Sequence, residues 1–154
     1  MKKILFLFLA IATLFTACKN ATFSESHDIK GLNWDEKDIQ TFNATIEPSG
    51  EQLFDIKATI RYASKCPIET LVLHYRITMP DGTMQEKQAD AIINQNGKNM
   101  GEGLGDIWDV KAFLLEDLKF PEGGKVKIEI GHNMPNPKVP LIMKIGTEIV
   151  KQTN

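Results

Sequence analysis

The clearest chemistry in this sequence belongs to Cys18, because of the residues that precede it. Lys2 and Lys3 start the chain, residues 4–15 are almost all apolar, and two small residues come directly before the cysteine. This order predicts a signal peptide over residues 1–17, and a cysteine at the cleavage point predicts a lipid on the Cys18 thiol. The alternative is an ordinary signal peptide followed by an incidental cysteine. Each buried methylene contributes about 0.8 kcal/mol, so two or three acyl chains would hold the protein firmly to a membrane.

Cys66 is the second cysteine of the chain, and with Cys18 lipidated it has no partner for an intramolecular disulfide. Its thiol can serve as a nucleophile, pair with another chain or be a small buried side chain. It lies beside Pro67 in a polar break, with no patterned histidine near it in sequence. We therefore expect Cys66 to be a buried structural residue.

The histidines and glycines form no familiar catalytic or metal-binding motif. No pair among His27, His74 and His132 has a metal-ligand spacing such as His-x-x-x-His. The sequence has no Gly-x-Ser-x-Gly elbow, and the glycine-rich run 101–105 is not followed by the lysine and helix start of a phosphate-binding loop. We expect no catalytic residue, no metal and no cofactor, and so not an enzyme.

Trp108 is the strongest candidate for a binding residue. It follows residues 94–106, which contain four glycines. An aromatic side chain on a flexible loop can stack on a sugar ring, which predicts a glycan-binding surface lipoprotein as one function. The alternative is that Trp108 closes one end of the core, where its large ring would bury much apolar area. Trp34 leaves the same two alternatives open.

The segments that must position these residues are strands, because apolar and polar residues alternate along most of the chain. The expected strands are residues 42–46, 54–62, 71–79, 126–130 and 141–150, together with a less regular and more polar returning strand at about residues 84–93. Turn sequences separate several of them, and the Asp-Gly pair of residues 80–83 favours a tight hairpin.

Two segments are less regular. The glycines of residues 94–106 predict a long loop or a bulged strand. Residues 109–118 fit a strand through Val110, Ala112 and Leu114 but also a short helix through Val110, Phe113 and Leu114. We favour the strand, because residues 120–124 then form a turn into the next alternating run.

These runs predict an all-β fold of about 7–8 strands with no helix after the signal peptide. Two antiparallel sheets packed face to face would bury the apolar side of each strand, so we expect a single antiparallel β-sandwich, jelly-roll-like in topology. The chain without its signal peptide is long enough for one such domain, over residues 31–154. Residues 18–30 predict a lipidated tether.

The charge balance and the residue after Cys18 bear on partners and location. The formal net charge of the full chain is −2, and the signal peptide carries two of its lysines. A mildly acidic protein of this kind is a poor nucleic-acid partner. Lys19 stands where an aspartate would favour the inner membrane, so we expect the outer membrane, facing the periplasm, with surface exposure as the alternative.

Short motifs in the C-terminal half carry a family resemblance. They are Gly103 to Trp108, the turn Phe120 to Gly124, the run His132-Asn133-Met134 and the closing run Ile145 to Val150. Trp34, Phe42, Arg61 and Pro67 extend the match more loosely towards the N-terminus. In these motifs the chain resembles the gliding-motility lipoprotein H family of Bacteroidota.

The resemblance implies a small all-β domain behind a lipoprotein signal peptide. It also implies an accessory, non-enzymatic role in the envelope machinery for gliding, which shares components with type IX secretion. The partners it implies are the membrane, through the N-terminal acyl chains, and other envelope or motility proteins, without a small-molecule substrate. It assigns no catalytic residue.

Overall fold

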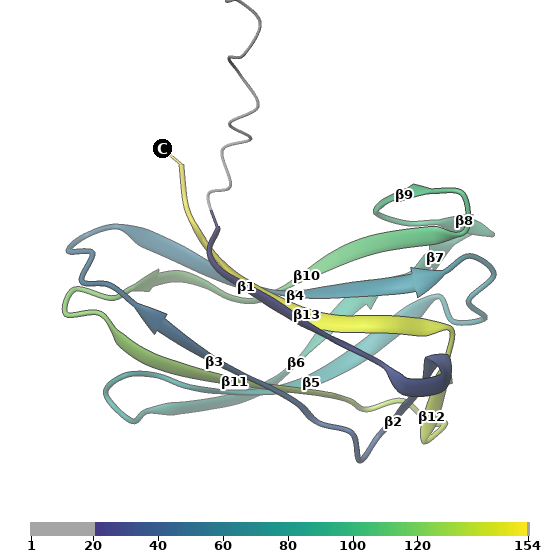
Figure 1. Cartoon of the computed structure of the whole chain (residues 1–154), viewed down its shortest axis with the longest axis horizontal. Helices are drawn as coiled ribbons and strands as arrows, with labels where there is room; N and C mark the ends of the chain where they lie inside the picture. Colours follow the sequence, from purple (N-terminus) through teal and green to yellow (C-terminus); the bar gives the residue numbers. More distant parts are fainter. Residues whose placement is uncertain (1–20, 154) are drawn as a thin grey trace, which may run out of the picture.

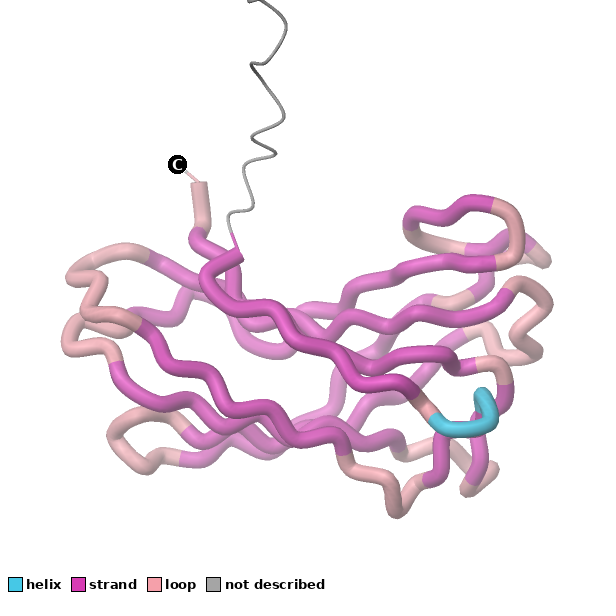
Figure 2. The backbone as a smooth tube through the Cα atoms, viewed as in Figure 1, coloured by secondary structure: helices cyan, strands magenta, loops and turns pink. Residues whose placement is uncertain are grey.

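A computed structural model describes residues 21–153 of the 154-residue chain. Its elements, in chain order, are β1 (Ala21–Asp28), η1 (Lys30–Leu32), β2 (Asn33–Asp35), β3 (Gln40–Ile46), β4 (Leu53–Ala63), β5 (Thr70–Thr78), β6 (Met84–Ile92), β7 (Asn94–Gln95), β8 (Lys98–Asn99), β9 (Glu102–Leu104), β10 (Ile107–Lys119), β11 (Gly124–His132), β12 (Lys138–Pro140) and β13 (Ile142–Lys151). Figure 2 shows strands along most of the described chain, with loops at their ends and one short helical turn at η1. Within the described residues, no helix is long and apolar enough to cross a membrane.

Two antiparallel sheets form the body of the molecule and lie one above the other in Figure 1. The larger sheet has the order β1-β13-β4-β10-β9, and the smaller sheet has the order β3-β11-β5-β6. The pairs β2–β12 and β7–β8 are short two-stranded ribbons. The expected all-β sandwich is confirmed.

The strand order is that of a jelly roll. When β9 and the two short ribbons are set aside, eight long strands remain, and in chain order they are arranged 1-8-3-6 in one sheet and 2-7-4-5 in the other. Five further strands of two or three residues are too brief to leave an alternating pattern in the sequence. For that reason the expected strand count matches the long strands and misses the short ones.

The core lies between the sheets, where alternate residues of each strand point inward. In β4 the inward positions include Phe54, Ile56, Ile60 and Tyr62, and each is at most 1% exposed. Trp34, whose position the sequence left open, is fully buried and donates its indole N–H to the Asp38 carbonyl at 2.9 Å. It therefore belongs to the core.

The prediction of a tether over residues 18–30 is wrong for residues 21–28, which form the edge strand β1. This strand pairs with β13 from Ala21↔Val150 to Asp28↔Lys144. The segment looks like a linker because an edge strand with a mostly solvent-exposed side needs few apolar residues, and its main-chain hydrogen bonds leave no trace in the sequence. Cys18 and the signal peptide lie outside the described residues.

Residues 109–118 lie in strand β10, as expected, and the structure explains the helix-like pattern. The register of β10 against β4 shifts between Phe113 and Leu115 and again between Leu115 and Leu118. As a result the consecutive residues Leu114 and Leu115 are both buried. A bulge thus breaks the period of two and imitates helical spacing.

The N-terminal end of β1 and the C-terminal end of β13 lie side by side on the larger sheet (Figure 1). The hairpin β9–β10 rises at the opposite end of the same sheet. The side of the larger sheet that faces away from the core therefore carries both features.

Candidate functional site

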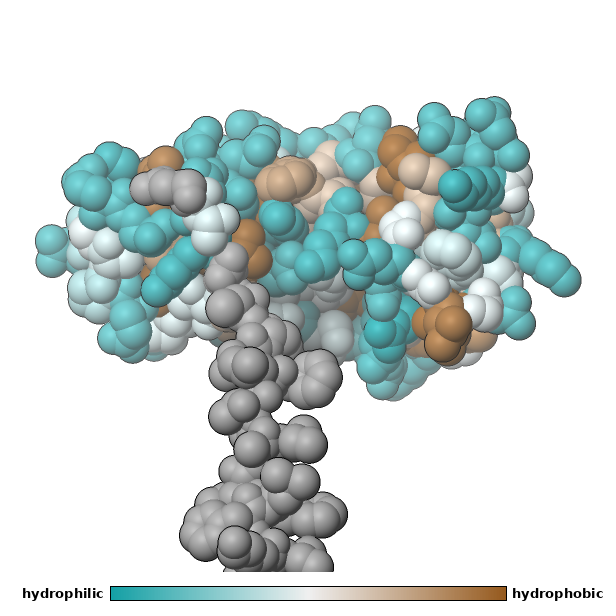
Figure 3. Space-filling model, turned by 90° about the horizontal axis from the view of Figure 1, so that it is seen from above, coloured by the Kyte–Doolittle hydropathy of each residue, from teal (hydrophilic) through white to brown (hydrophobic). Residues whose placement is uncertain are grey.

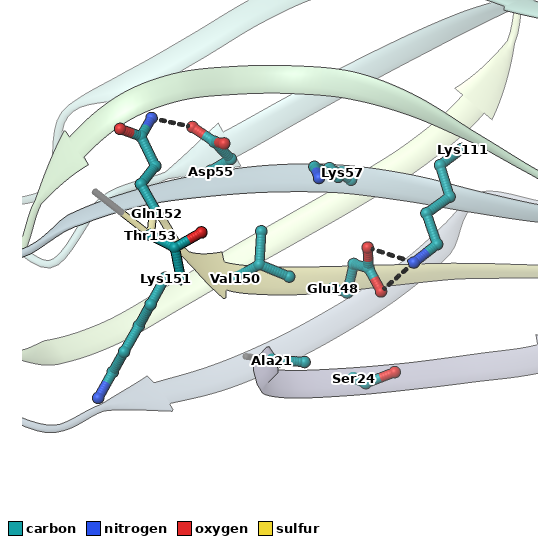
Figure 4. Close-up of a pocket in the computed structure, with 10 residues that line it drawn as sticks. All are labelled: Ala21, Ser24, Asp55, Lys57, Lys111, Glu148, Val150, Lys151, Gln152 and Thr153. Carbon is teal, nitrogen blue, oxygen red and sulfur yellow. Dashed lines mark hydrogen bonds and ion pairs between the residues drawn. The ribbon is translucent and has the colours of Figure 1, made fainter. Parts of the chain in front are cut away.

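An open groove of about 700 Å³ lies on the outer face of the larger sheet, beside the start of β1 (Figure 4). Residues from four neighbouring strands line it because their outward positions are in register. Across the sheet, Ser24 of β1 faces Glu148 of β13, which faces Lys57 of β4, which faces Phe113 of β10. The groove is thus a product of the jelly-roll order, which brings the first and last strands together.

Several polar groups in this groove are bound to one another, and Lys57 Nζ lies 4.4 Å from the centroid of the Phe113 ring. The Lys111 Nζ lies 2.8 Å and 3.0 Å from the two carboxylate oxygens of Glu148, whose side chain is only 10% exposed. The Gln152 amide donates to Asp55 at 2.7 Å and to Asp117 at 2.9 Å. Such mutually paired groups suit a stable polar surface for contact better than proton transfer or nucleophilic attack.

The sequence missed this cluster. Alternation shows which side chains of a strand share a face, but it does not show that the last strand lies between β1 and β4. The sequence held only part of the information needed to find it. Glu148 occupies an outward position of the closing alternating run, but an acidic residue at such a position is common and does not indicate a partner.

Trp108 lies in β10 opposite Tyr62 of β4 and Gly103 of β9. It is partly buried, packs against the core and donates its indole N–H to the Gly105 carbonyl at 3.2 Å. A Cβ atom at Gly103 would lie only 2.4 Å from the Trp108 ring. Gly103 has no side chain and therefore leaves room for the Trp108 ring. The ring in turn holds the β9–β10 hairpin in place.

Tyr62 lies fully buried in the core at the same end of the sandwich. Its hydroxyl donates to the carbonyls of Ile93 and Met100, at 2.8 Å and 2.6 Å, and burial raises the pKa of its phenol. This arrangement gives Trp108 a structural task. The glycan-binding hypothesis is not tested by it and stays a prediction.

Cys66 is 3% exposed, and its thiol donates to the Pro140 carbonyl at 3.5 Å. Burial raises the pKa of the Cys66 thiol, which keeps it protonated and unreactive at neutral pH. The expectation of a buried structural cysteine is confirmed.

The three histidines lie at separate places. His27 stacks on Phe42 with ring centroids 4.5 Å apart, and His74 lies 2.8 Å from a Glu86 carboxylate oxygen. His132 is buried, with its Nε2 3.1 Å from the Trp34 carbonyl. Among residues 21–153, no group of three or more His, Cys, Asp or Glu side chains is placed to hold a metal ion.

Comparison with known proteins adds the family context. The family model described as GldH lipoprotein matches residues 21–149, which is nearly the whole described domain. The chain is 30% identical over 125 residues to a protein named gliding motility lipoprotein GldH from Flavobacterium johnsoniae, covering 80% of this chain and 76% of that one. It is 27% identical over 131 residues to a gliding motility lipoprotein GldH homolog from Christiangramia forsetii, covering 84% and 79% of the two chains.

Proposed function

This chain belongs to the GldH lipoprotein family, and from that premise we propose that it supports gliding motility as a lipid-anchored, non-catalytic protein of the cell envelope. It acts through contacts with other envelope or motility proteins, at the outer membrane and facing the periplasm. Cys18 carries the lipid.

The observation that carries this proposal is the agreement between the family match and the folded domain. The match begins at Ala21, where β1 begins, and ends within β13. The shared unit of the family is thus the complete sandwich, and Cys18 lies three residues before it. This layout supports an anchor directly followed by a contact-making domain.

The surface chemistry supports a non-catalytic role. In the outer groove, the ion pair between Lys111 and Glu148 neutralises both of these side chains. The raised pKa of the Cys66 thiol keeps this side chain protonated, and a protonated thiol is a poor nucleophile. Exposed surfaces of paired charges are suited to protein contacts, in which they set partner choice and register.

The test is complementation of a deletion strain of the native host, scored by colony spreading. We expect the wild-type gene to restore spreading and Cys18→Ala to fail, because the variant protein is released from the membrane fraction. Cys18 precedes the folded domain, so the purified variant should unfold at the wild-type temperature.

Cys66→Ala is the matched control, because it removes the other cysteine and leaves the anchor. It should remain in the membrane fraction and restore spreading. A Cys18→Ala protein that stays membrane-bound and restores spreading would overturn the lipid anchor, and unchanged spreading of the deletion strain would overturn the motility role.

A further inference from the structure

The outer face of the larger sheet carries three of the large apolar side chains that are exposed to solvent. Leu104 is 91% exposed, Phe113 is 50% exposed and Ile107 is 44% exposed. Leu104 and Ile107 are direct cross-strand partners of the β9–β10 hairpin, so their side chains point to the same side. Figure 3 looks down on this face and shows hydrophobic groups standing among hydrophilic ones.

The hairpin that presents Leu104 is held in place. Trp108 fixes it from the core side, as described above. At its turn, the Ser64 hydroxyl donates to the Asp106 carboxylate at 2.5 Å, and the Ser64 N–H donates to the Asp106 carbonyl at 2.8 Å. A rigid apolar hairpin loses little conformational entropy when it inserts into a membrane or a partner surface, and this favours binding.

The same face lies next to the attachment point of the chain. Only two residues, Lys19 and Asn20, stand between Cys18 and Ala21, where β1 begins, so three steps along the chain connect them. A chain spans at most about 3.6 Å per residue, so Ala21 must remain within about 11 Å of a lipid-bearing Cys18. The domain cannot stand far from the bilayer, and the side of the molecule around Ala21 must be near the headgroups.

The apolar hairpin lies at the other end of this face. Ala21 pairs with Val150, which pairs with Asp55 of β4, whereas Ile107 pairs with Ala63 at the end of β4. At about 3.4 Å per residue, the eight steps from Asp55 to Ala63 separate the two ends by about 27 Å. Two contact points so far apart would fix the orientation of the whole sheet.

Most charges between these two ends are paired, and one exception is Lys57, whose Nζ lies 4.4 Å from the centroid of the Phe113 ring. Arg61 binds Asp109 through two hydrogen bonds of 2.8 Å, and the Lys144 Nζ lies 3.0 Å from Asp28. With the Lys111–Glu148 pair, three ion pairs each balance a positive and a negative charge along the face. The face therefore meets a lipid surface without strong attraction or repulsion, and the apolar side chains decide the contact.

We propose that the outer face of the larger sheet rests on the bilayer, with Leu104 and Ile107 of the β9–β10 hairpin inserted among the lipid headgroups as a second point of attachment. The proposal rests on the lipid anchor of the proposed function. The acyl chains retain the protein at the membrane, and the hairpin sets its orientation, which leaves the smaller sheet turned towards partners.

The experiment places an environment-sensitive fluorophore at single introduced cysteines of the full lipidated protein. Leu104→Cys reports on the hairpin, and Met84→Cys is the matched control, because Met84 is 67% exposed but lies in the smaller sheet. The lipid blocks the Cys18 thiol and burial protects Cys66, so wild-type protein gives the labelling background. The proteins are incorporated into phosphatidylcholine vesicles, with and without a quarter of phosphatidylglycerol.

We expect the probe at position 104 to show blue-shifted, several-fold brighter emission on vesicles and to be quenched by lipids that carry nitroxides near the headgroup. The probe at position 84 should keep its emission in water. The paired charges predict the same result in both lipid mixtures and at high salt.

If the protein floats with the vesicles but position 104 remains in water, the docking proposal is overturned while the anchor stands, and the hairpin is then free for a protein partner. Burial at position 104 only with phosphatidylglycerol would overturn the apolar mechanism. If wild-type protein lacks the lipid and does not float, both proposals fail.

Discussion

At the scale of single residues, the structure assigns Trp108 and His132 to the packing of the sandwich. Trp108 fills the space that Gly103 leaves free, and His132 lies edge-on to Trp34 with ring centroids 5.0 Å apart. The sequence left two alternative roles open for Trp108 and assigned no role to His132. The partners of both residues come from other strands, so the sequence alone could not establish their packing roles.

Trp108→Ala should lower the free energy of unfolding by about 2 kcal/mol, less than the 3–5 kcal/mol typical of a fully buried aromatic residue. The physical reason is the loss of the partly buried ring from its contact with Gly103. Urea denaturation measures the change, and Trp108→Phe, which keeps a ring, should lose less. Unchanged stability together with lost saccharide binding would instead support the glycan hypothesis.

His132 should make the stability depend on pH. Burial lowers the pKa of its imidazole, while the Trp34 carbonyl and the carboxylates of Glu36 and Asp35 oppose that shift. The unfolded chain then takes up the proton at a higher pH than the folded chain. The stabilisation is complete above a pH of about 6.5 and declines as the pH falls from there towards the folded-state pKa, with a slope of at most about 1.4 kcal/mol per pH unit.

Urea midpoints measured from pH 7.5 to 5 would show this decline, and His132→Gln should flatten it. His74→Gln is the matched control, because it removes an exposed imidazole. Equal slopes in wild type and His132→Gln would contradict the assignment.

At the scale of elements, alternating strands such as β4 and β5 could be predicted from sequence because each has one apolar side, and the hairpin at residues 80–83 could be predicted from its turn sequence. Strand β1 could not be predicted, since its stability comes from main-chain pairing with β13, at the far end of the chain. The bulges of β10 appeared in the sequence only as a pattern that fitted both a strand and a short helix. Of the site, Trp108 could be singled out, whereas the Lys111–Glu148 pair depends on the strand order.

Gly146 of β13 leaves no room for a side chain between its two neighbouring strands, β1 and β4. A Cβ atom there would lie 2.5 Å from the Thr59 hydroxyl and 2.6 Å from the Glu25 carbonyl. Gly146→Ala should therefore push β1 away, destabilise the protein by about 1–3 kcal/mol and speed amide exchange in β1. Lys144→Ala, which removes an exposed ion pair between the same strands, should change exchange little; equal exchange in both variants would contradict this account.

At the scale of the whole molecule, the short connection between anchor and domain limits how the sandwich can face the membrane. Inserting about ten Gly and Ser residues between Cys18 and Ala21 would give a flexible linker about 18 Å in average length. We expect the protein to stay membrane-bound and equally stable, but the probe at position 104 should lose part of its lipid contact, because the effective concentration of the hairpin at the surface falls.

The same insertion placed after Thr153 is the control, since it adds length without separating anchor and domain. It should leave the emission of the probe unchanged. An identical loss of lipid contact from both insertions would show that the linker acts in some other way than by distance.

The pairing of β1 with β13 also orders events in time. If the chain is exported from its N-terminus, β1 emerges first and β13 last. The partner of β1 is therefore about as distant in sequence as the domain allows. Contacts of such long range close slowly, on the scale of milliseconds to seconds for all-β domains. Until the last strand arrives, the larger sheet lacks the strand that joins β1 to β4. The larger sheet can therefore be completed only after β13, the last strand of the domain, is available to pair with both β1 and β4.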